Sequence, residues 1–426
     1  MKILIISHNA LTTFEAMGKT TLSLLSGYSK EELSQFFIYP SKPNVDACSS
    51  YYRITDKDIL RSYYRFKVKG ECILPDLSTS SMFEKSGDES FYRNPRKDKP
   101  LVRIIRDAMW QFSRWNNKEL KAWIKRQSPD CVFATPGAAK FMYDIAITVS
   151  KEFNIPLVGY LCDEYYFVKK PHNLMHIVQV GMLKHKIEEY MACASHIISI
   201  SEELTSLYSD HFKKPVTTIM TGASIPISKQ MLENRNGVIS FFGNVRCNRY
   251  LSLIKIGKEL ERINKEEDTS FVLEIHASEK NPDIINALRS VSTIKLCGFV
   301  TGEEYVKALH QSDYLLHVES FDENSIDFVK NSISTKIADS LASGVPLIAY
   351  GPGSIASIKH LMSNNCAFVI TENDNLHDRL KETMTDTKSK DAIVVNALGV
   401  ANQLHNPKVN EKKVKAVFDS VVGNNK

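Results

Sequence analysis

DYLLHVESFDENSIDFVKNSISTKIADSLASGVPLIAY, residues 313–350, reads as strand, acid, polar loop, helix and strand. Tyr314–Val318 and Leu347–Tyr350 are mostly apolar runs of the kind found in buried parallel strands. Between them, hydroxyl side chains at positions 332, 334 and 335 are typical of a helix N-terminus, and Gly344 followed by Pro346 is a helix stop. This strand–helix–strand unit predicts an α/β fold built on parallel sheets.

The predicted helix presents an anion-binding end. Its first turn, which includes Ser334 and Thr335, has unpaired backbone N–H groups and the positive end of the helix dipole, and Lys336 adds a full charge. Asp339 projects from the same side and can accept hydrogen bonds from paired sugar hydroxyls. Glu319 follows the preceding strand, at the edge where ligands of open parallel sheets bind. These residues predict a diphosphate site with acids beside it.

Three runs of this stretch carry a resemblance: Glu319-Ser320-Phe321, STKIAD at 334–339 and LASGVP at 341–346. They resemble the donor site of family 4 retaining glycosyltransferases, which have the GT-B architecture, and the resemblance covers nearly the whole chain. It implies two Rossmann-like α/β domains with an active site in the cleft between them. It also implies a nucleotide-sugar donor and neither a metal nor another cofactor, with Asp339 on the ribose hydroxyls and Glu319 near the sugar.

The composition is that of an ordinary soluble protein. The 426 residues are 43% hydrophobic and 24% charged, which is enough chain for two domains with separate cores. Eight cysteines are scattered singly without a C-x-x-C pair, which predicts reduced thiols in a cytoplasmic protein and argues against a zinc knuckle. No apolar run approaches membrane-spanning length, and we expect no signal peptide. The net charge of +5 permits an anionic partner, but no nucleic-acid-binding signature is present.

The N-terminus predicts a strand, a loop and a helix. Lys2–Ile6 is a continuous apolar strand after its first residue, and the following loop leads to Gly18-Lys19-Thr20. A phosphate-binding P-loop is disfavoured because the glycine expected five residues before Gly18 is Thr13. We expect Glu15 and Gly18 to line a cleft that faces the donor, as the glycine loop does in the resembled family. The alternative is a plain helix start.

Two acidic stretches farther on have different interpretations. Asp56-Lys57-Asp58 is a D-x-D string without a preceding predicted strand, so we expect a solvated turn and no metal site. Pro156–Leu161 is a predicted strand, and Asp163 and Glu164 follow it, with His172 on the next loop. Side chains at a strand's carboxyl end face the ligand edge, so these three are acceptor-side candidates. The alternative for each is a surface or capping group.

A polar segment, Ser228–Gly237, is the predicted linker. The predicted domains are therefore residues 1–227, on the acceptor side, and residues 228–405, which bind the nucleotide-sugar. Residues 406–426 include a helix that crosses back to the first domain. After the predicted strand Val238–Phe242, Gly243 allows close approach of a ligand, and Arg249 and Arg246 can reach phosphate oxygens. The resemblance places Phe299 and Val300 in the pocket of the nucleotide base.

All three tryptophans lie within a basic stretch, residues 93–126. A helix over Leu101–Gln127 is predicted from periodic apolar residues, and its basic and aromatic remainder suits an anionic lipid surface. We therefore expect peripheral attachment to the inner face of a cytoplasmic membrane and a lipid-linked saccharide acceptor. The alternative is that the tryptophans pack in the N-terminal core and the charges are solvated.

The resulting hypothesis is a retaining, metal-independent glycosyltransferase that acts in surface polysaccharide synthesis. In this hypothesis Glu319, Lys336 and Arg249 carry catalysis, and the helix N-terminus helps to stabilise the leaving diphosphate. Two alternatives remain. A nucleotide-sugar epimerase can use the same architecture. A non-catalytic partner subunit would explain why Asp339 is shorter than the usual glutamate and why Glu319 lies farther before it than in the family's usual pattern.

Overall fold

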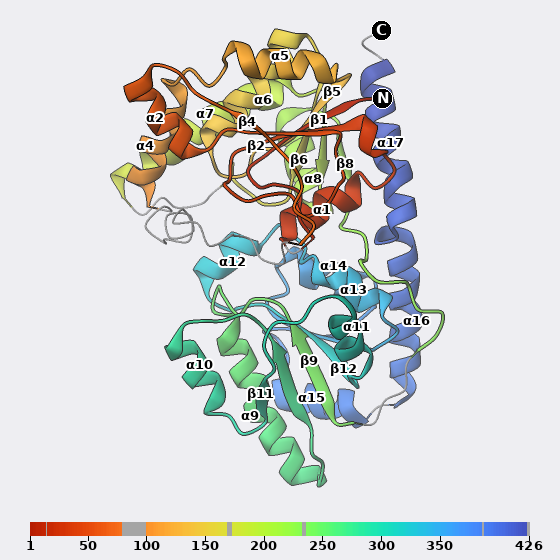
Figure 1. Cartoon of the computed structure of the whole chain (residues 1–426). Coiled ribbons are helices and arrows are strands. Elements are labelled where there is room, and N and C mark those ends of the chain that lie inside the picture. The colour runs from red at the N-terminus through yellow and green to blue at the C-terminus, as the bar shows by residue number, and fades with distance from the viewer. Residues whose placement is uncertain (14, 79–98, 168–172, 232–235, 386, 424–426) are drawn as a thin grey trace. The chain divides into compact units, whose positions relative to one another are not determined.

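A computed structural model describes residues 1–13, 15–78, 99–167, 173–231, 236–385 and 387–423. The chain forms two compact units (Figure 1): unit 1 is Met1–Ile219 with Glu411–Lys426, and unit 2 is Met220–Asn410. Each unit has its own sheet with helices packed on it, so the predicted α/β fold class is confirmed. None of the helices in these ranges combines the length and the hydropathy that a membrane-spanning segment needs.

The unit 1 sheet has the strand order β4-β3-β2-β1-β5-β6-β7-β8, parallel throughout except for the β3–β4 pair. The central strand β1 is buried along its whole length because it pairs on both sides, with Ile5 opposite Gln35 and Phe133. The strands are β1 (Ile3–Ser7), β2 (Leu33–Phe37), β3 (Ser50–Arg53), β4 (Glu71–Ile73), β5 (Cys131–Thr135), β6 (Leu157–Leu161), β7 (His196–Ser199) and β8 (Val216–Thr218).

The helices of unit 1 include the C-terminal helix α17 (Pro407–Gly423), which belongs to this unit from Glu411 onwards. Val414 and Phe418 of α17 are buried. The centroid of the Phe418 ring lies 5.9 Å from that of Tyr28 and 5.8 Å from that of Phe133. The other helices are α1 (Ala16–Leu24), α2 (Asp56–Arg65), α4 (Pro100–Gln111), α5 (Lys118–Gln127), α6 (Lys140–Phe153), α7 (Leu174–Cys193), α8 (Glu202–Phe212) and a 3-10 turn (Lys30–Glu32).

The unit 2 sheet is wholly parallel, with the order β11-β10-β9-β12-β13-β14. Alternate residues of its strands enter two separate hydrophobic cores, as when Leu315 enters one and Leu316 the other. The strands are β9 (Val238–Phe242), β10 (Val272–His276), β11 (Ile294–Leu296), β12 (Tyr314–Val318), β13 (Leu347–Tyr350) and β14 (Phe368–Ile370).

Helices cover this sheet: α9 contacts β10 and α10 contacts β11, and Figure 1 shows α9 and α10 beside β11. The helices of unit 2 are α9 (Arg249–Glu267), α10 (Pro282–Arg289), α11 (Gly302–His310), α12 (Glu323–Val329), α13 (Lys336–Ala342), α14 (Ala356–Ser363), α15 (Leu376–Thr385) and α16 (Thr387–Leu404).

The single helix predicted over Leu101–Gln127 is wrong: α4 and α5 are separate, with a break over residues 112–117. Asn117 starts α5, because its side chain accepts a hydrogen bond from the Leu120 amide at 2.9 Å. Trp110, Trp115 and Trp123 are all buried in the unit 1 core. The alternative interpretation of the tryptophans is therefore the right one.

The solvated turn predicted at Asp56-Lys57-Asp58 is also wrong. Strand β3 precedes this string, and Thr55 and Asp58 form a capping box that starts α2. Asp56 is buried; its carboxylate accepts from Arg106 Nε at 3.0 and 3.1 Å and from Trp110 Nε1 at 2.7 Å. A buried carboxylate needs such partners, and they come from a helix far along the chain.

The packing of α17 predicts a stability effect. Phe418→Ala should destabilise unit 1 by about 3–5 kcal/mol, because it leaves a cavity between α17 and the sheet. Denaturant unfolding followed by tryptophan fluorescence measures this, since every tryptophan lies in unit 1. Lys415→Ala, at an exposed position of the same helix, is the control and should shift the free energy of unfolding by less than about 0.5 kcal/mol. Equal unfolding curves for the two variants would contradict the packing of α17.

Candidate functional site

A buried ion pair lies at the carboxyl edge of the unit 2 sheet. Glu319 directly follows β12, and Arg249 is the first residue of α9, which follows β9. Arg249 donates to Glu319 from Nε to Oε2 and from Nη2 to Oε1, both at 2.9 Å, and the Glu319 side chain is only 2% exposed. Two of the three predicted catalytic residues are therefore in direct contact. The bidentate geometry fixes the guanidinium plane, and the pair carries no net charge.

The surroundings of Glu319 hold it rigidly. Ser252 Oγ donates to its backbone carbonyl at 2.8 Å, and a Cβ at position 351 would lie 2.9 Å from its own Cβ, so Gly351 is required. His317 Nε2 lies 3.5 Å from Glu319 Oε1, and burial lowers the pKa of His317 to about 4, which leaves a neutral imidazole. Sequence reasoning missed His317, although a residue two positions before Glu319 on the same strand faces the same way.

The helix predicted to bind an anion is α13, which begins at Lys336. Thr335 stands at its N-cap without a side-chain capping hydrogen bond, so the predicted hydroxyl cap is wrong. The amide of Ser334 donates instead to Ser357 Oγ at 3.0 Å. The Lys336 ammonium lies 5.1 Å from the centre of the Tyr305 ring, a cation–π contact. The predicted stop is correct, because Gly344 has a left-handed φ of +79°.

Asp339 is buried and hydrogen-bonded within unit 2. Its carboxylate accepts from the Ser224 amide at 2.6 Å, from Ser224 Oγ at 2.9 and 3.0 Å, and from the Tyr305 hydroxyl at 3.0 Å. These donors use much of the capacity of the two oxygens. Asp339 therefore fastens the segment around Ser224 to α13, and its contact with ribose hydroxyls remains a prediction.

The other donor-side candidates lie in loops after β9 and β11. Gly243 follows β9, and its amide donates to the His276 carbonyl at 3.3 Å. Arg246 is exposed in the same loop. Phe299 is also exposed, whereas Val300 is half-buried against the core formed by α11 and α13. An exposed aromatic ring beside a backbone turn at Gly298 can stack on a planar ligand.

Unit 1 contains a cavity of about 490 Å³ at the carboxyl ends of β1, β5 and β6. Most of its lining is apolar, from residues such as Leu11, Met17 and Phe141. Polar and charged residues also line it: Ser7, His8, Asn9, Asp107, Asp163, Arg103 and Arg106. This is the composition of a pocket for a ligand with both an apolar and a polar part.

Glu15 and Gly18 lie in and after the loop that follows β1. Glu15 is buried; its Oε2 accepts from Asn9 Nδ2 at 2.6 Å and its Oε1 has no hydrogen-bond partner. Burial outweighs that hydrogen bond and raises the pKa of Glu15 to about 7. Gly18 lines the cavity, and a Cβ there would lie 2.4 Å from the Thr12 carbonyl oxygen, so only glycine fits.

The acceptor-side candidates after β6 have different surroundings. Asp163 lines the cavity, and its Oδ2 accepts from the Tyr165 hydroxyl at 3.1 Å. Glu164 Oε1 accepts from the amides of Tyr166 and Phe167 at 2.6 and 2.7 Å, so it caps its own loop, and burial raises its pKa. His172 lies outside the described residues.

Sequence reasoning missed several cavity residues. His8 follows β1 directly, and its Nε2 lies 2.7 Å from the Pro136 carbonyl oxygen. Asp107 is buried on α4 and accepts from the Phe141 amide at 3.1 Å, and burial raises its pKa to about 6. The position of His8 after a strand was a usable signal, whereas Asp107 reaches the cavity only through the packing of α4 on α6.

Comparisons with known proteins identify the architecture. No protein-family profile and no curated protein sequence matches the chain. The fold is similar to that of HepE from Anabaena, solved in complex with UDP, at 12% identity and a TM-score of 0.62 over 99% of this chain and 100% of the other. It is also similar to sucrose-phosphate synthase from Thermosynechococcus elongatus, at 8% identity and a TM-score of 0.63 over 100% of both chains.

A third similar structure is the UDP-forming α,α-trehalose-phosphate synthase of Burkholderia vietnamiensis, at 8% identity and a TM-score of 0.59 over 99% of this chain and 100% of the other. All three are enzymes of the GT-B type in fold, with two α/β domains. At these identities the likeness concerns the fold, and the chain therefore has the GT-B fold that its sequence predicted.

Proposed function

We propose that this chain is a glycosyltransferase of the family 4 type, which moves a sugar from a nucleotide-sugar to a saccharide acceptor with retention of configuration. The observation that carries the proposal is the full-length fold similarity to HepE, which was solved with UDP and with UDP-glucose. Unit 2 supports it independently, because Arg246 and Arg249 follow β9 and Lys336 begins α13 after β12, so all three basic residues come after the carboxyl ends of parallel strands.

In this proposal unit 2 binds the donor. Lys336, the amides of Thr335 and Lys336 at the start of α13, and Arg246 after Gly243 stabilise the diphosphate as it leaves. Fixed cations then do the electrostatic work that Mg²⁺ or Mn²⁺ does in other transferases, so neither ion is needed. Phe299 and Val300 hold the base.

The roles of the two acids follow from their contacts. Glu319 holds Arg249 in a fixed orientation through two hydrogen bonds, which use Nε and Nη2. The guanidinium is therefore already oriented when a phosphate oxygen binds to its other N–H groups. Arg249 Nη1 donates to Asn244 Oδ1 at 3.2 Å, a long hydrogen bond that a stronger acceptor can replace. Asp339 keeps α13 in place and contacts the ribose.

Lys336→Met should lower the rate constant kcat/KM for the nucleotide-sugar by about two orders of magnitude, because it removes one preorganised charge at the leaving group. Release of nucleoside diphosphate from a panel of nucleotide-sugars, with Mg²⁺ and Mn²⁺ omitted or added, measures it. Lys359→Met, at an exposed position of α14 in the same unit, is the matched control and should leave the rate unchanged.

Equal rates for these two variants would contradict the diphosphate role of Lys336. A rise of tenfold or more on addition of Mg²⁺ or Mn²⁺ would contradict the metal-independent mechanism. Interconversion of nucleotide-sugars in the absence of any acceptor would identify an epimerase instead.

The cavity in unit 1 is the proposed acceptor site. Its polar part, with Asp163 and His8, suits sugar hydroxyls, and its apolar part suits a hydrocarbon group of the same molecule. Glu15, at the same end of β1, has the protonation equilibrium near neutral pH that a proton-accepting group needs. We therefore propose a lipid-linked saccharide as the acceptor, in the synthesis of a surface polysaccharide.

The raised pKa of Glu15 makes stability depend on pH. The folded protein favours the neutral carboxyl. The protonated Glu15 therefore makes its full contribution to the free energy of unfolding below the unfolded pKa of 4.5, and this contribution is lost as pH rises through about 7. Glu15→Gln should therefore stabilise unit 1 at pH 8 by up to about 3 kcal/mol, and much less at pH 4. Denaturant unfolding at both values measures this.

Glu202→Gln, at an exposed position in the first turn of α8, is the matched control and should change the free energy of unfolding by less than about 1 kcal/mol at either pH. A Glu15→Gln variant that is no more stable than the wild type at pH 8 would show that the carboxyl is not held in a desolvated site.

The surface around the cavity supports membrane attachment. Exposed apolar side chains lie along α4 and after it, at Leu101, Ile105 and Phe112, and at the start of α7, which packs against α4. Ile105 also lines the cavity, so the apolar surface continues into it. Lys99 and Arg114 are exposed at the two ends of this segment. We propose that this surface attaches to the anionic inner face of a cytoplasmic membrane.

Co-sedimentation with anionic vesicles should therefore fall at least tenfold when Leu101, Ile105 and Phe112 are changed to serine, and binding should weaken as salt rises. Arg106 is unsuitable for this test because it pairs with buried Asp56. The control changes Phe328 and Met362, exposed apolar residues of unit 2, to serine. Equal binding of both variants would contradict the α4 surface, and no wild-type binding at low salt would contradict membrane attachment.

A further inference from the structure

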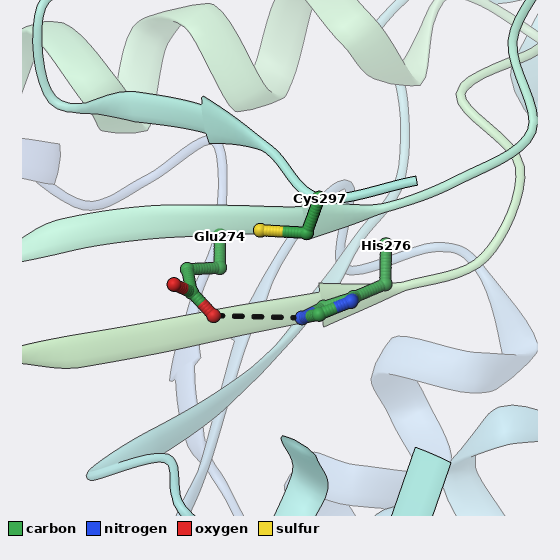
Figure 2. Close-up of side chains that lie close together, drawn as sticks. All are labelled: Glu274, His276 and Cys297. Carbon is green, nitrogen blue, oxygen red and sulfur yellow. Dashed lines mark ion pairs between the residues drawn. The ribbon is translucent and has the colours of Figure 1, made fainter. Parts of the chain in front are cut away.

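Three side chains with metal-binding atoms meet on the unit 2 sheet (Figure 2). Glu274 and His276 are alternate residues of β10, so they point to the same face of the sheet. Cys297 follows the neighbouring strand β11, and its amide donates to the Ile275 carbonyl at 3.0 Å, which sets its side chain beside His276. The three ligand atoms lie within 4.8 Å of one another.

The imidazole of His276 is buried without a hydrogen bond to any described residue. His276 is 6% exposed, and in the described part of the chain neither Nδ1 nor Nε2 has a hydrogen-bond partner. Buried polar groups are normally satisfied, so this ring is an exception that calls for a ligand. Its Nε2 faces Glu274 Oε2 at 3.6 Å (Figure 2), and Phe242 stacks on the ring with centroids 4.5 Å apart, which fixes its orientation.

Glu274 has one oxygen engaged and the other directed at the histidine. Oε1 accepts from the Lys295 ammonium at 2.8 Å, while Oε2 is the atom nearest His276 Nε2. Lys295 is mostly exposed, so water screens its charge. The carboxylate therefore presents one oriented oxygen to the space between the three side chains, and its contact with Lys295 fixes its position.

We propose that Glu274, His276 and Cys297 form a zinc site. An imidazole nitrogen, a thiolate sulfur and a carboxylate oxygen are the ligands of Zn²⁺ in proteins, whereas Mg²⁺ and Ca²⁺ prefer oxygen alone. Tetrahedral zinc with bonds of about 2.0–2.3 Å sets its ligand atoms roughly 3.3–3.7 Å apart. The Glu274–His276 distance already meets this, and Cys297 Sγ has to move by about 1 Å at most.

Binding of Zn²⁺ releases one proton. The Cys297 thiol gives its proton to solvent as the Zn–S bond forms, His276 binds as the neutral imidazole, and water fills the fourth position. Within the part of the chain that the structure describes, no other group of three such side chains comes this close together. The ion would join β10 to the end of β11, next to the turn that carries Phe299.

Zinc titration of the chelator-treated full-length protein tests the proposal. Elemental analysis after gel filtration should give one Zn²⁺ per chain, and Co²⁺ substitution should give a thiolate-to-cobalt charge-transfer band. His276→Ala and Cys297→Ser should each weaken binding at least a hundredfold, and Cys297→Ser should abolish the band. Cys247→Ser, another half-buried cysteine of unit 2, is the matched control and should retain both the ion and the band.

Circular dichroism establishes that each variant is folded. Failure of the wild type to bind zinc, or equal binding by Cys297→Ser and Cys247→Ser, would overturn the proposal, as would a cobalt spectrum without the charge-transfer band. The titration contains no nucleotide, so its outcome is independent of the proposed sugar transfer.

Discussion

The bidentate ion pair between Arg249 and Glu319 is the interaction on which the geometry of the unit 2 edge depends. Both side chains are largely withdrawn from water, so removing one partner would leave an uncompensated buried charge, a loss of about 3–5 kcal/mol. The pair joins the first residue of α9 to the end of β12. Helix α9 follows β9, and β9 and β12 are neighbours in the sheet. Gly351 packs against the base of Glu319, because a Cβ at position 351 would lie 2.9 Å from the Glu319 Cβ.

This pairing also decides which charges a ligand meets. Glu319 is neutralised by Arg249, and Asp339 is surrounded by the donors of Ser224 and Tyr305, so neither acid presents an open negative charge at the edge. In the proposed donor site Arg246 and Lys336 supply positive charge, which favours a diphosphate. The Glu274–His276–Cys297 cluster has a different chemistry, because a carboxylate oxygen, an imidazole nitrogen and a sulfur together suit a transition metal and not a phosphate group.

Local sequence patterns predicted strands and helix ends, whereas contacts between residues far apart in the sequence could not be predicted. Val238–Phe242 is a strand as predicted, because an apolar run broken by Ser240 alone suits a strand buried on both faces. The stop at Gly344 was also readable, since a left-handed residue ends a helix. Arg249 and Glu319 were each selected from the sequence, but their contact spans 70 residues and no local pattern encodes it. Local patterns also do not encode the contact of Asp56 with Arg106, 50 residues away. They do not encode the approach of Cys297 to His276 either.

The central claim is that unit 2 binds the diphosphate of a nucleotide-sugar. Hydrogen–deuterium exchange with and without saturating nucleoside diphosphates tests it most directly, because it reports which backbone amides a ligand protects. The account predicts slower exchange in residues 243–249, 298–300 and 334–339 with at least one nucleoside diphosphate, and no protection by the nucleoside alone in 334–339. Unchanged exchange in all three segments with every nucleoside diphosphate would contradict it.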